Sequence, residues 1–234
     1  MAKEDIKLSV EEMEKAGVNF GHKVSKLHPK MKAYVSGVKN GVNLFDLEKI
    51  SKEFIKALTF VSKIVSEGKT IIFVGTKIQL RAVITEAAEE CGVPCVTERW
   101  LGGTFTNFET IQKRVNYFKD LEKKKESGEL EKYTKKERLN FDREISSLKI
   151  KFGGIRNMAK LPDAVFIFGL DKDITCAKEA KRRGVKIISI VDTNVNPDIV
   201  DYPIPANDDA ISSVRYILGK VRDVIITSKG EMKK

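Results

Sequence analysis

Residues 21–32 of this chain form a basic segment with four lysines, and further candidate cations are Arg99, Lys113, Arg114, Arg156 and Lys160. Lys and Arg neutralise phosphate groups and release the counterions around them, so such clusters are typical of proteins that bind nucleic acid. For any single lysine, the alternative is a charge that simply faces water. The candidate RNA contacts are Lys23, Lys26, His28, Lys30, Lys32, Arg99, Lys113, Arg114, Arg156 and Lys160.

The overall charge agrees with that interpretation. The 234 residues include 43 Lys and Arg against 33 Asp and Glu, which gives a formal net charge of +10. A surplus of this size favours a polyanionic partner, most simply nucleic acid, over a protein that is merely basic. No apolar run approaches the ~20 residues that cross a bilayer, and the N-terminus lacks the apolar core of a secretion signal. We therefore expect no membrane partner.

A second set of side chains has the chemistry to hold a metal ion. His22, Asp192 and Asp208 combine nitrogen and oxygen donors, a mixture that suits zinc. Their positions are scattered and lack a helical spacing. The alternative is structural, with Asp208 capping the last helix and Asp192 ending a strand in a turn. We expect no cofactor, and a structural zinc or magnesium ion at these residues is the alternative.

Catalytic motifs are missing from the chain. Gly75-Thr76-Lys77 lies between a predicted strand and helix, where backbone amides attract phosphate. However, the sequence contains neither GxGxxG nor GxxxxGK[ST], and it has no GxSxG nucleophile turn. The three cysteines form no CxxC pair, so we expect them to be reduced and mostly buried. These observations predict a protein that is not an enzyme and has no small-molecule substrate.

The segments that must position these residues alternate between strand and helix. Apolar runs without alternation are typical of parallel strands that are covered on both faces, and helices show apolar residues at steps of three and four. The predicted strands are 70–74, 94–97, 164–168 and 186–191, and the predicted helices are 47–66, 78–91, 174–183 and 209–227. This alternation predicts an α/β fold with a doubly wound parallel sheet.

The N-terminal part is less regular. Ser9 and Glu12 have the spacing of a capping box, which predicts a helix over 9–16 that ends at Gly17. The basic residues 21–32 show little periodicity and are predicted to form an irregular loop. Residues 42–45 alternate like a short strand.

One segment interrupts the predicted sheet. Residues 107–152 hold two apolar seams at steps of three and four, separated by Ser127-Gly128, and a second capping box begins at Thr134. Two such seams joined by a short turn predict an inserted antiparallel coiled-coil helical hairpin. The domain division that follows is a core of residues 1–106 and 153–234, with 107–152 as the inserted hairpin.

The only tryptophan lies where the core meets this hairpin. Trp100 is followed by Gly102-Gly103, and glycines allow a sharp change of chain direction. Trp100 offers either a flat face for stacking on a base or a packed anchor for the junction. The anchor is favoured because tryptophan is highly buried on average, and Arg99 keeps the stronger expectation of contacting RNA.

Four blocks in family order resemble the bacterial-type family of small-subunit ribosomal protein two. The first joins GVNFGHK (17–23), HPKMK (28–32) and NLFDLEK (43–49). The second is FVGTK (73–77) and the third is RWLGGTFTN (99–107). The fourth joins KLPD (160–163), IVDTN (190–194) and DYPIPANDDA (201–210). Asn19 stands where the family often has histidine, and Phe108 where it often has tryptophan.

The resemblance implies a flavodoxin-like α/β domain with an inserted coiled-coil hairpin. It also implies a non-catalytic protein of the cytoplasmic ribosome that binds 16S rRNA in the 30S subunit, beside neighbouring 30S proteins. A further implied role is to help recruit the mRNA-binding ribosomal protein one. Two rival functions stay open at this point, a nucleotide-dependent enzyme and an RNA-binding regulator that works outside the ribosome.

Overall fold

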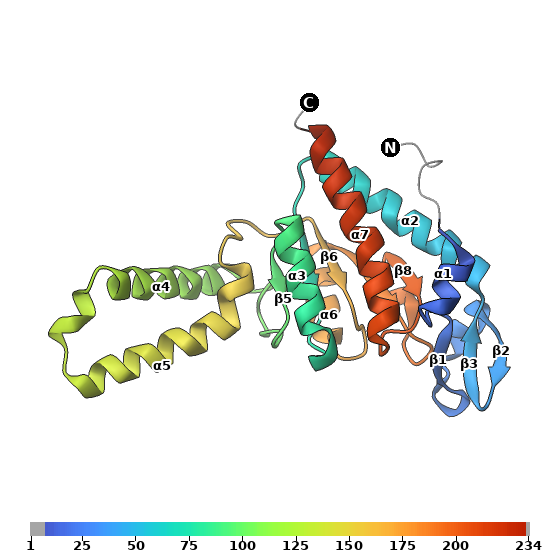
Figure 1. Cartoon of the computed structure of the whole chain (residues 1–234), viewed down its shortest axis with the longest axis horizontal. Coiled ribbons are helices and arrows are strands. Elements are labelled where there is room, and N and C mark those ends of the chain that lie inside the picture. Colours follow the sequence, from blue (N-terminus) through green and yellow to red (C-terminus); the bar gives the residue numbers. More distant parts are fainter. Residues whose placement is uncertain (1–7, 233–234) are drawn as a thin grey trace.

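The centre of the protein is a five-stranded parallel sheet (Figure 1). The computed structural model describes residues 8–232. The strands are β4 (Ile71–Val74), β5 (Cys95–Val96), β6 (Ala164–Ile167), β7 (Lys186–Val191) and β8 (Tyr202–Pro205). Their spatial order is β5-β4-β6-β7-β8. Numbered along the chain this order is 2-1-3-4-5, the arrangement of flavodoxin-like doubly wound sheets. The predicted α/β fold with a parallel sheet is confirmed.

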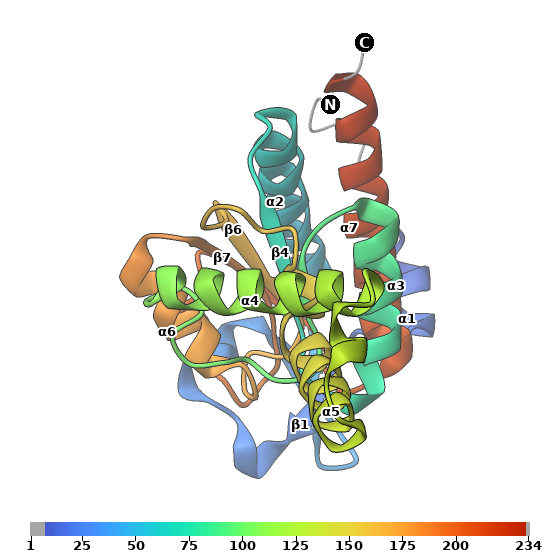
Figure 2. The ribbon, with the colours of Figure 1, turned by 90° about the vertical axis from the view of Figure 1, so that its left-hand side faces the viewer.

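Helices cover both faces of this sheet. One face carries α2 (Leu47–Ser66), α3 (Arg81–Cys91) and α7 (Ile211–Met232), and both α2 and α3 pack against α7. The other face carries α6 (Ile174–Arg183), as the view along the sheet in Figure 2 shows. A short 3-10 helix, η3 (Ile78–Leu80), precedes α3, and another, η6 (Pro197–Ile199), precedes β8.

Strand β8 was not predicted from the sequence, and it contains two residues that are unusual in strands, Pro203 and Pro205. Its position explains the prolines. β8 pairs only with β7 and forms one edge of the sheet, where missing backbone donors are tolerated. The rule that proline is excluded from strands therefore holds for central strands, whereas β8 lies at the edge of the sheet.

The hydrophobic core lies on both sides of the central strands. All residues of β4 and β6 are buried, which accounts for their unbroken apolar sequence. Phe73 packs edge-on against Phe166 and Phe168, with ring centroids 6.0 and 5.4 Å apart. The three cysteines are free and buried, as expected.

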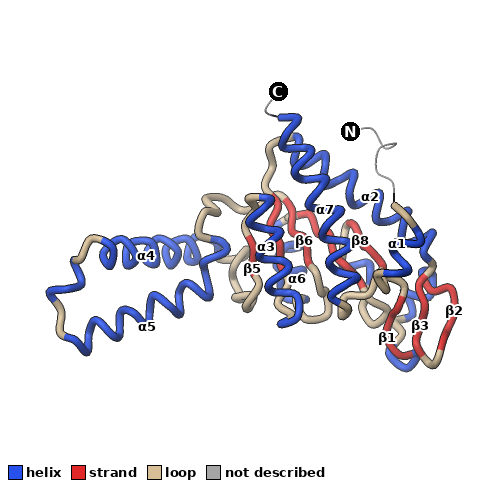
Figure 3. Tube along the Cα trace, in the orientation of Figure 1, coloured by secondary structure: helices blue, strands red, loops and turns tan. Residues whose placement is uncertain are grey.

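The N-terminal part forms a second, smaller sheet at the periphery, drawn in red in Figure 3. After α1 (Val10–Lys15), strands β1 (Phe20–Lys23), β2 (Val35–Lys39) and β3 (Val42–Phe45) pair antiparallel in the order β1-β3-β2. Two 3-10 helices, η1 (Val24–Lys26) and η2 (Pro29–Tyr34), lie between β1 and β2. The prediction of an irregular loop over 21–32 was therefore wrong in part.

Two long helices project from the opposite end of the protein (Figure 1). They are α4 (Phe108–Glu126) and α5 (Lys135–Phe152), and η4 (Glu129–Lys132) lies between them. Thr134 caps α5 with the predicted capping box, in which Thr134 and Glu137 exchange bonds. The side chains buried in these helices are Ile111, Val115, Phe118, Leu121, Ile145, Leu148 and Phe152. η5 (Gly153–Ile155) then returns the chain to the core beside β5. Among the helices of residues 8–232, none is both long and apolar enough to span a membrane.

Candidate nucleic-acid interface

The first group of basic candidates lies on β1 and the two 3-10 helices that follow it. Lys23, Lys26 and Lys32 are exposed and form no ion pair with another described residue. Lys30 is also exposed, but its ammonium pairs with Asp198. His28 differs from the lysines, because its ring nitrogen Nδ1 accepts a hydrogen bond from the Lys30 amide at 3.3 Å. His28 therefore serves as a cap of η2 more than as a free RNA contact.

This basic segment is fixed to the core through the loop after β7. The backbone N–H of His28 donates to the Thr193 carbonyl at 2.7 Å, and that of His22 donates to the Thr193 hydroxyl at 2.9 Å. A side chain at Gly21 would lie 2.5 Å from the Thr193 methyl carbon, so glycine is required for this close approach. Lys23, Lys26 and Lys32 therefore belong to a segment that is held against the core by hydrogen bonds to Thr193.

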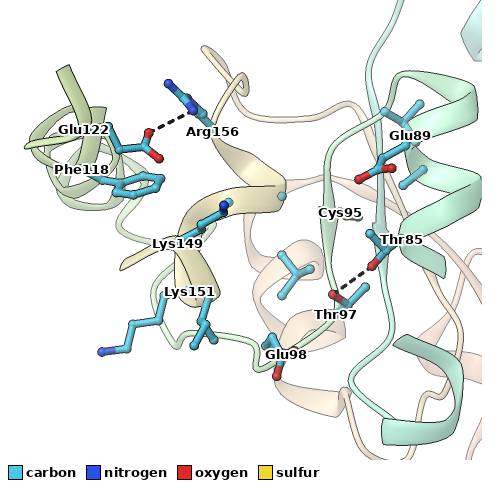
Figure 4. A pocket seen from close by; sticks show the side chains of 16 residues that line it. Thr85, Glu89, Cys95, Thr97, Glu98, Phe118, Glu122, Lys149, Lys151 and Arg156 are labelled. Atoms are coloured by element: carbon cyan, nitrogen blue, oxygen red, sulfur yellow. Dashed lines mark hydrogen bonds and ion pairs between the residues drawn. The ribbon is translucent and has the colours of Figure 1, made fainter. Parts of the chain in front are cut away.

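The second group of candidates surrounds the base of the projecting helices. Arg99 precedes the Trp100 turn, and Lys113 and Arg114 lie on the exposed side of α4. Arg156 pairs with Glu122 at 3.0 Å, as Figure 4 shows, so its charge is partly neutralised. Lys160 is exposed and forms no ion pair with another described residue.

The structure separates these two groups. The small sheet lies at one end of the long axis, and the base of α4 and α5 lies near its middle, on the other side of the parallel sheet (Figure 1). The ten candidates therefore do not form a single pocket. An RNA that contacted both groups would have to extend across the parallel-sheet core (Figure 1).

The Trp100 turn is a packed joint, as the sequence favoured. Trp100 is 8% exposed, and its ring meets Phe105 edge-on with centroids 4.8 Å apart. Such burial leaves no free face on which an RNA base could stack. Gly103 adopts a φ of +95°, a conformation that a residue with a side chain rarely takes, so it is the glycine that the turn requires.

A buried carboxylate that the sequence analysis missed holds this joint. Glu179 of α6 is 6% exposed, and its two oxygens accept hydrogen bonds from the turn. Oε1 accepts from the Trp100 ring N–H at 3.3 Å and from the Gly103 amide at 2.8 Å. Oε2 accepts from the Phe105 amide at 3.0 Å and from the Thr106 amide at 3.3 Å. These donors replace the water that a buried carboxylate loses.

The donor groups of the motif Gly75-Thr76-Lys77 bind carboxylates of the protein itself. The Thr76 amide and hydroxyl donate to buried Asp173 at 3.0 and 2.8 Å. Burial raises the pKa of Asp173, and the bonds from Thr76 oppose that rise. The Lys77 ammonium lies 2.7 Å from carboxylate oxygens of both Asp208 and Asp209. The groups that would hold a phosphate in a nucleotide-binding fold are therefore engaged internally.

The predicted metal residues are brought near each other, but Asp208 has a different partner. His22 lies between Asp192 and Asp209, with its ring nitrogens 3.1 and 3.3 Å from their oxygens. The hydrogen bond to Asp192 raises the pKa of His22, although burial acts against it. Asp208 pairs instead with Lys77, and burial raises the pKa of Asp208 to about 6.

Among residues 8–232, no group of three or more His, Cys, Asp or Glu residues is arranged to hold a metal. The metal site stays a prediction, which metal analysis of the wild-type protein and a His22→Ala variant would test. The structural alternative was right for Asp192, whose carboxylate accepts from the Thr193 amide after β7. It was wrong for Asp208. Asn207 instead accepts from the amides of Asp209 and Ala210 just before α7, because Asp208 turns inward to Lys77.

Comparison with known proteins places the sequence in a family. The model of the family described as ribosomal protein S2 matches residues 13–228. The chain belongs to the ribosomal protein S2 family. Proteins named small ribosomal subunit protein uS2 are similar along nearly the whole chain. The one from Dehalococcoides mccartyi is 40% identical over 96% of this chain and 92% of its own length. The one from Francisella philomiragia is 43% identical over 94% of this chain and 92% of its own length.

Membership of the ribosomal protein S2 family settles one of the rival functions. This is a family of ribosomal proteins, so the chain is not an enzyme. The structure agrees with that conclusion, because Lys77 pairs with Asp208 and Thr76 donates to Asp173 instead of facing an open phosphate site. Of the two departures from the family pattern, Phe108 begins α4 and packs against the core, and the Asn19 carbonyl accepts from the Phe45 amide at 2.8 Å. Phe108 therefore has a packing role, whereas the bond at Asn19 is made by its backbone and does not depend on the asparagine side chain.

Proposed function

We propose that this protein is a structural component of the small ribosomal subunit that binds 16S rRNA. The observation that carries the proposal is the near full-length similarity, at 40–43% identity, to proteins named for that subunit. The net charge of +10 supports an RNA partner. Proteins of the small subunit work in the bacterial cytoplasm, where this chain would assemble with 16S rRNA and neighbouring 30S proteins.

The proposed mechanism is electrostatic and shape-based. Exposed lysines and arginines neutralise phosphates, while double-helical RNA is recognised mainly through its backbone and 2′-hydroxyl groups. The strongest candidates are those that are exposed and form no ion pair with another described residue: Lys23, Lys26, Lys32, Arg99, Lys113, Arg114 and Lys160. His28, Lys30 and Arg156 are weaker candidates because each already has a partner within the chain.

We further propose that residues 107–152 act as a coiled-coil arm, with residues 1–106 and 153–234 as the core. The buried seams of α4 and α5 support this division, and so does the projection of both helices from the sheet (Figure 1). Such an arm would contact RNA or neighbouring 30S proteins at a distance from the core. Helping to recruit the mRNA-binding ribosomal protein one is a finer proposal that rests on the family resemblance.

A direct binding measurement tests the rRNA proposal. The wild-type chain is titrated onto 16S rRNA at several salt concentrations, next to a Lys23→Glu, Lys26→Glu, Lys32→Glu variant. We expect steep salt dependence for the wild type and, for the variant, weaker binding with a slope smaller by roughly 2 to 3, because each lost phosphate contact lowers the slope by about 0.7 to 0.9.

The matched control for that variant changes the charge by the same amount elsewhere. Lys52→Glu, Lys63→Glu and Arg215→Glu alter exposed residues of α2 and α7. This control variant is expected to bind like the wild type. A wild-type chain that binds 16S rRNA no better than an unrelated RNA of equal length contradicts the proposed function.

A further inference from the structure

The exposed side of α6 carries positive charge alone. Lys178, Lys181, Arg182 and Arg183 are all exposed in this ten-residue helix. Its single carboxylate, Glu179, is turned inward and bonded to the Trp100 turn. Glu179 is therefore not available to neutralise the cations beside it.

These four cations also lack partners from neighbouring elements. None of them forms an ion pair with another described residue. The basic residues of α5 are also unpaired, but α5 exposes a carboxylate, Glu137, among them, and α6 exposes none. Some cations of other helices do have partners. Lys125 of α4 pairs with Asp142 at 2.6 Å, and Arg222 of α7 pairs with Glu90 at 3.1 Å. The charge on α6 is thus left unneutralised within the described part of the chain.

Two carboxylates near the C-terminal end of α6, Asp163 and Asp201, are already engaged. The Lys186 amide donates to the Asp163 carbonyl at 3.1 Å, which places the end of α6 beside the segment that contains Lys160. The Asp163 carboxylate accepts from the Thr70 amide at 2.8 Å, and Asp201 pairs with the Lys186 ammonium at 2.8 Å. The basic surface therefore continues from α6 toward Lys160 at the base of the arm.

A purely structural explanation accounts for only part of this pattern. Cations in the last turn of a helix interact favourably with its dipole, and Lys181, Arg182 and Arg183 lie there. Lys178 and Arg182, however, are four residues apart, a spacing at which like charges repel. An anionic partner would relieve that repulsion, which the helix alone does not.

We propose that the face of the sheet covered by α6 lies against RNA, and that this helix binds the phosphate backbone. The proposed surface consists of Lys160, Lys178, Lys181, Arg182 and Arg183. α6 is about 15 Å long at 1.5 Å per residue, enough to follow several phosphates. The opposite face carries mixed charge, because α3 exposes Glu86 and Glu89 there while α2 exposes Lys52 and Lys63. This inference rests on the proposed function and assigns a surface to it.

A charge-reversal experiment on the full-length chain tests the surface. The variant Lys178→Glu, Arg182→Glu, Arg183→Glu is titrated onto 16S rRNA at several salt concentrations. The control is the Lys52→Glu, Lys63→Glu, Arg215→Glu variant, which makes the same charge change on the opposite face. We expect the α6 variant to bind at least about tenfold more weakly than the control, with a salt slope smaller by roughly 2 to 3.

The outcomes separate the inference from the proposed function. If the α6 variant binds like the control while the Lys23, Lys26 and Lys32 variant binds weakly, the α6 surface is wrong and the proposed function stands. If the wild-type chain shows no preference for 16S rRNA, the proposed function fails and the α6 surface fails with it. A neutral variant, Lys178→Gln, Arg182→Gln, Arg183→Gln, answers the same question if charge reversal prevents folding, because equal affinity for it and the control also overturns the surface.

Discussion

At the scale of single residues, buried carboxylates explain much of this structure. Glu179 forms no ion pair with another described residue and instead accepts hydrogen bonds from donors of the Trp100–Thr106 turn. Asp173 accepts from Thr76 in a similar way, whereas Asp208 is neutralised by Lys77. Each carboxylate joins segments that are far apart in the sequence. These contacts fix the junctions of the fold, so they are expected to matter for stability.

Replacing Glu179 with glutamine should therefore weaken the joint. The amide nitrogen of the introduced side chain would face backbone donors and leave at least one of them unpaired, at a cost of about 1 to 3 kcal/mol in the free energy of unfolding. Denaturant unfolding of Glu179→Gln measures this cost. The control is Glu89→Gln, which changes the same side chain at an exposed position of α3. Equal stability of the two variants would show that the joint does not depend on the Glu179 bonds.

Lys77 allows a second residue-scale prediction. Its ammonium is largely buried beside Asp208, so Lys77→Met should leave that carboxylate without a partner and cost about 3 kcal/mol or more. Adding Asp208→Asn should recover part of the loss, because the unpaired charge is then removed. Lys56→Met breaks the exposed pair with Glu53 and should cost less than ~1 kcal/mol. Thermal or denaturant unfolding of the wild type and these three variants measures the losses of stability. A loss for Lys77→Met that is no larger than the loss for Lys56→Met would contradict the prediction.

At the scale of elements, the projecting helices depend on a narrow buried seam. Phe118 of α4 is 1% exposed, whereas its neighbour Tyr117 is 38% exposed. Phe118→Ala should cost about 3 to 5 kcal/mol of local stability, since a buried phenyl ring is lost and a cavity is left. Amide hydrogen exchange should become faster in α4 and α5 and remain slow in β4 and β6. Tyr117→Ala is the control, and equal exchange in both variants would contradict a packed seam.

The elements also show what local sequence patterns predict. α2 and α6 were predicted at the residues where they occur, because apolar spacing and a following glycine mark their ends. β1 was missed because its pairing with β3 is non-local and leaves no period in four residues. β2 was also missed, although Asn40-Gly41 is a hairpin signal, and both residues adopt the positive φ that a tight turn requires.

In the candidate site, too, local features could be predicted from the sequence and non-local contacts could not. The exposed lysines could be found from the sequence because charge density is a local property. Glu179 could not, because a glutamate between Lys178 and Lys181 looks like part of a solvated surface. The one signal is its spacing, three residues after Cys176 and one before Ala180, on the side of α6 that is buried. The partners of His22 and Lys77 depend on the fold in the same way.

At the scale of the whole molecule, charge and shape divide the surface into regions. Basic residues lie on the small N-terminal sheet, around the base of the arm and on α6, while α3 on the opposite face exposes glutamates. The edge of the parallel sheet where ligands bind in related folds is filled here by the ion pairs of Lys77. Both observations favour a protein that acts by binding over a broad surface.

Sedimentation of cell extracts tests the central proposal most directly. A tagged full-length chain is followed through a sucrose gradient at moderate salt, together with the Lys23→Glu, Lys26→Glu, Lys32→Glu variant and the matched control. We predict that the wild type and the control comigrate with small ribosomal subunits and that the variant shifts toward the top of the gradient. A wild-type chain that stays at the top, free of subunits, would contradict the proposal and favour an RNA-binding regulator that works outside the ribosome.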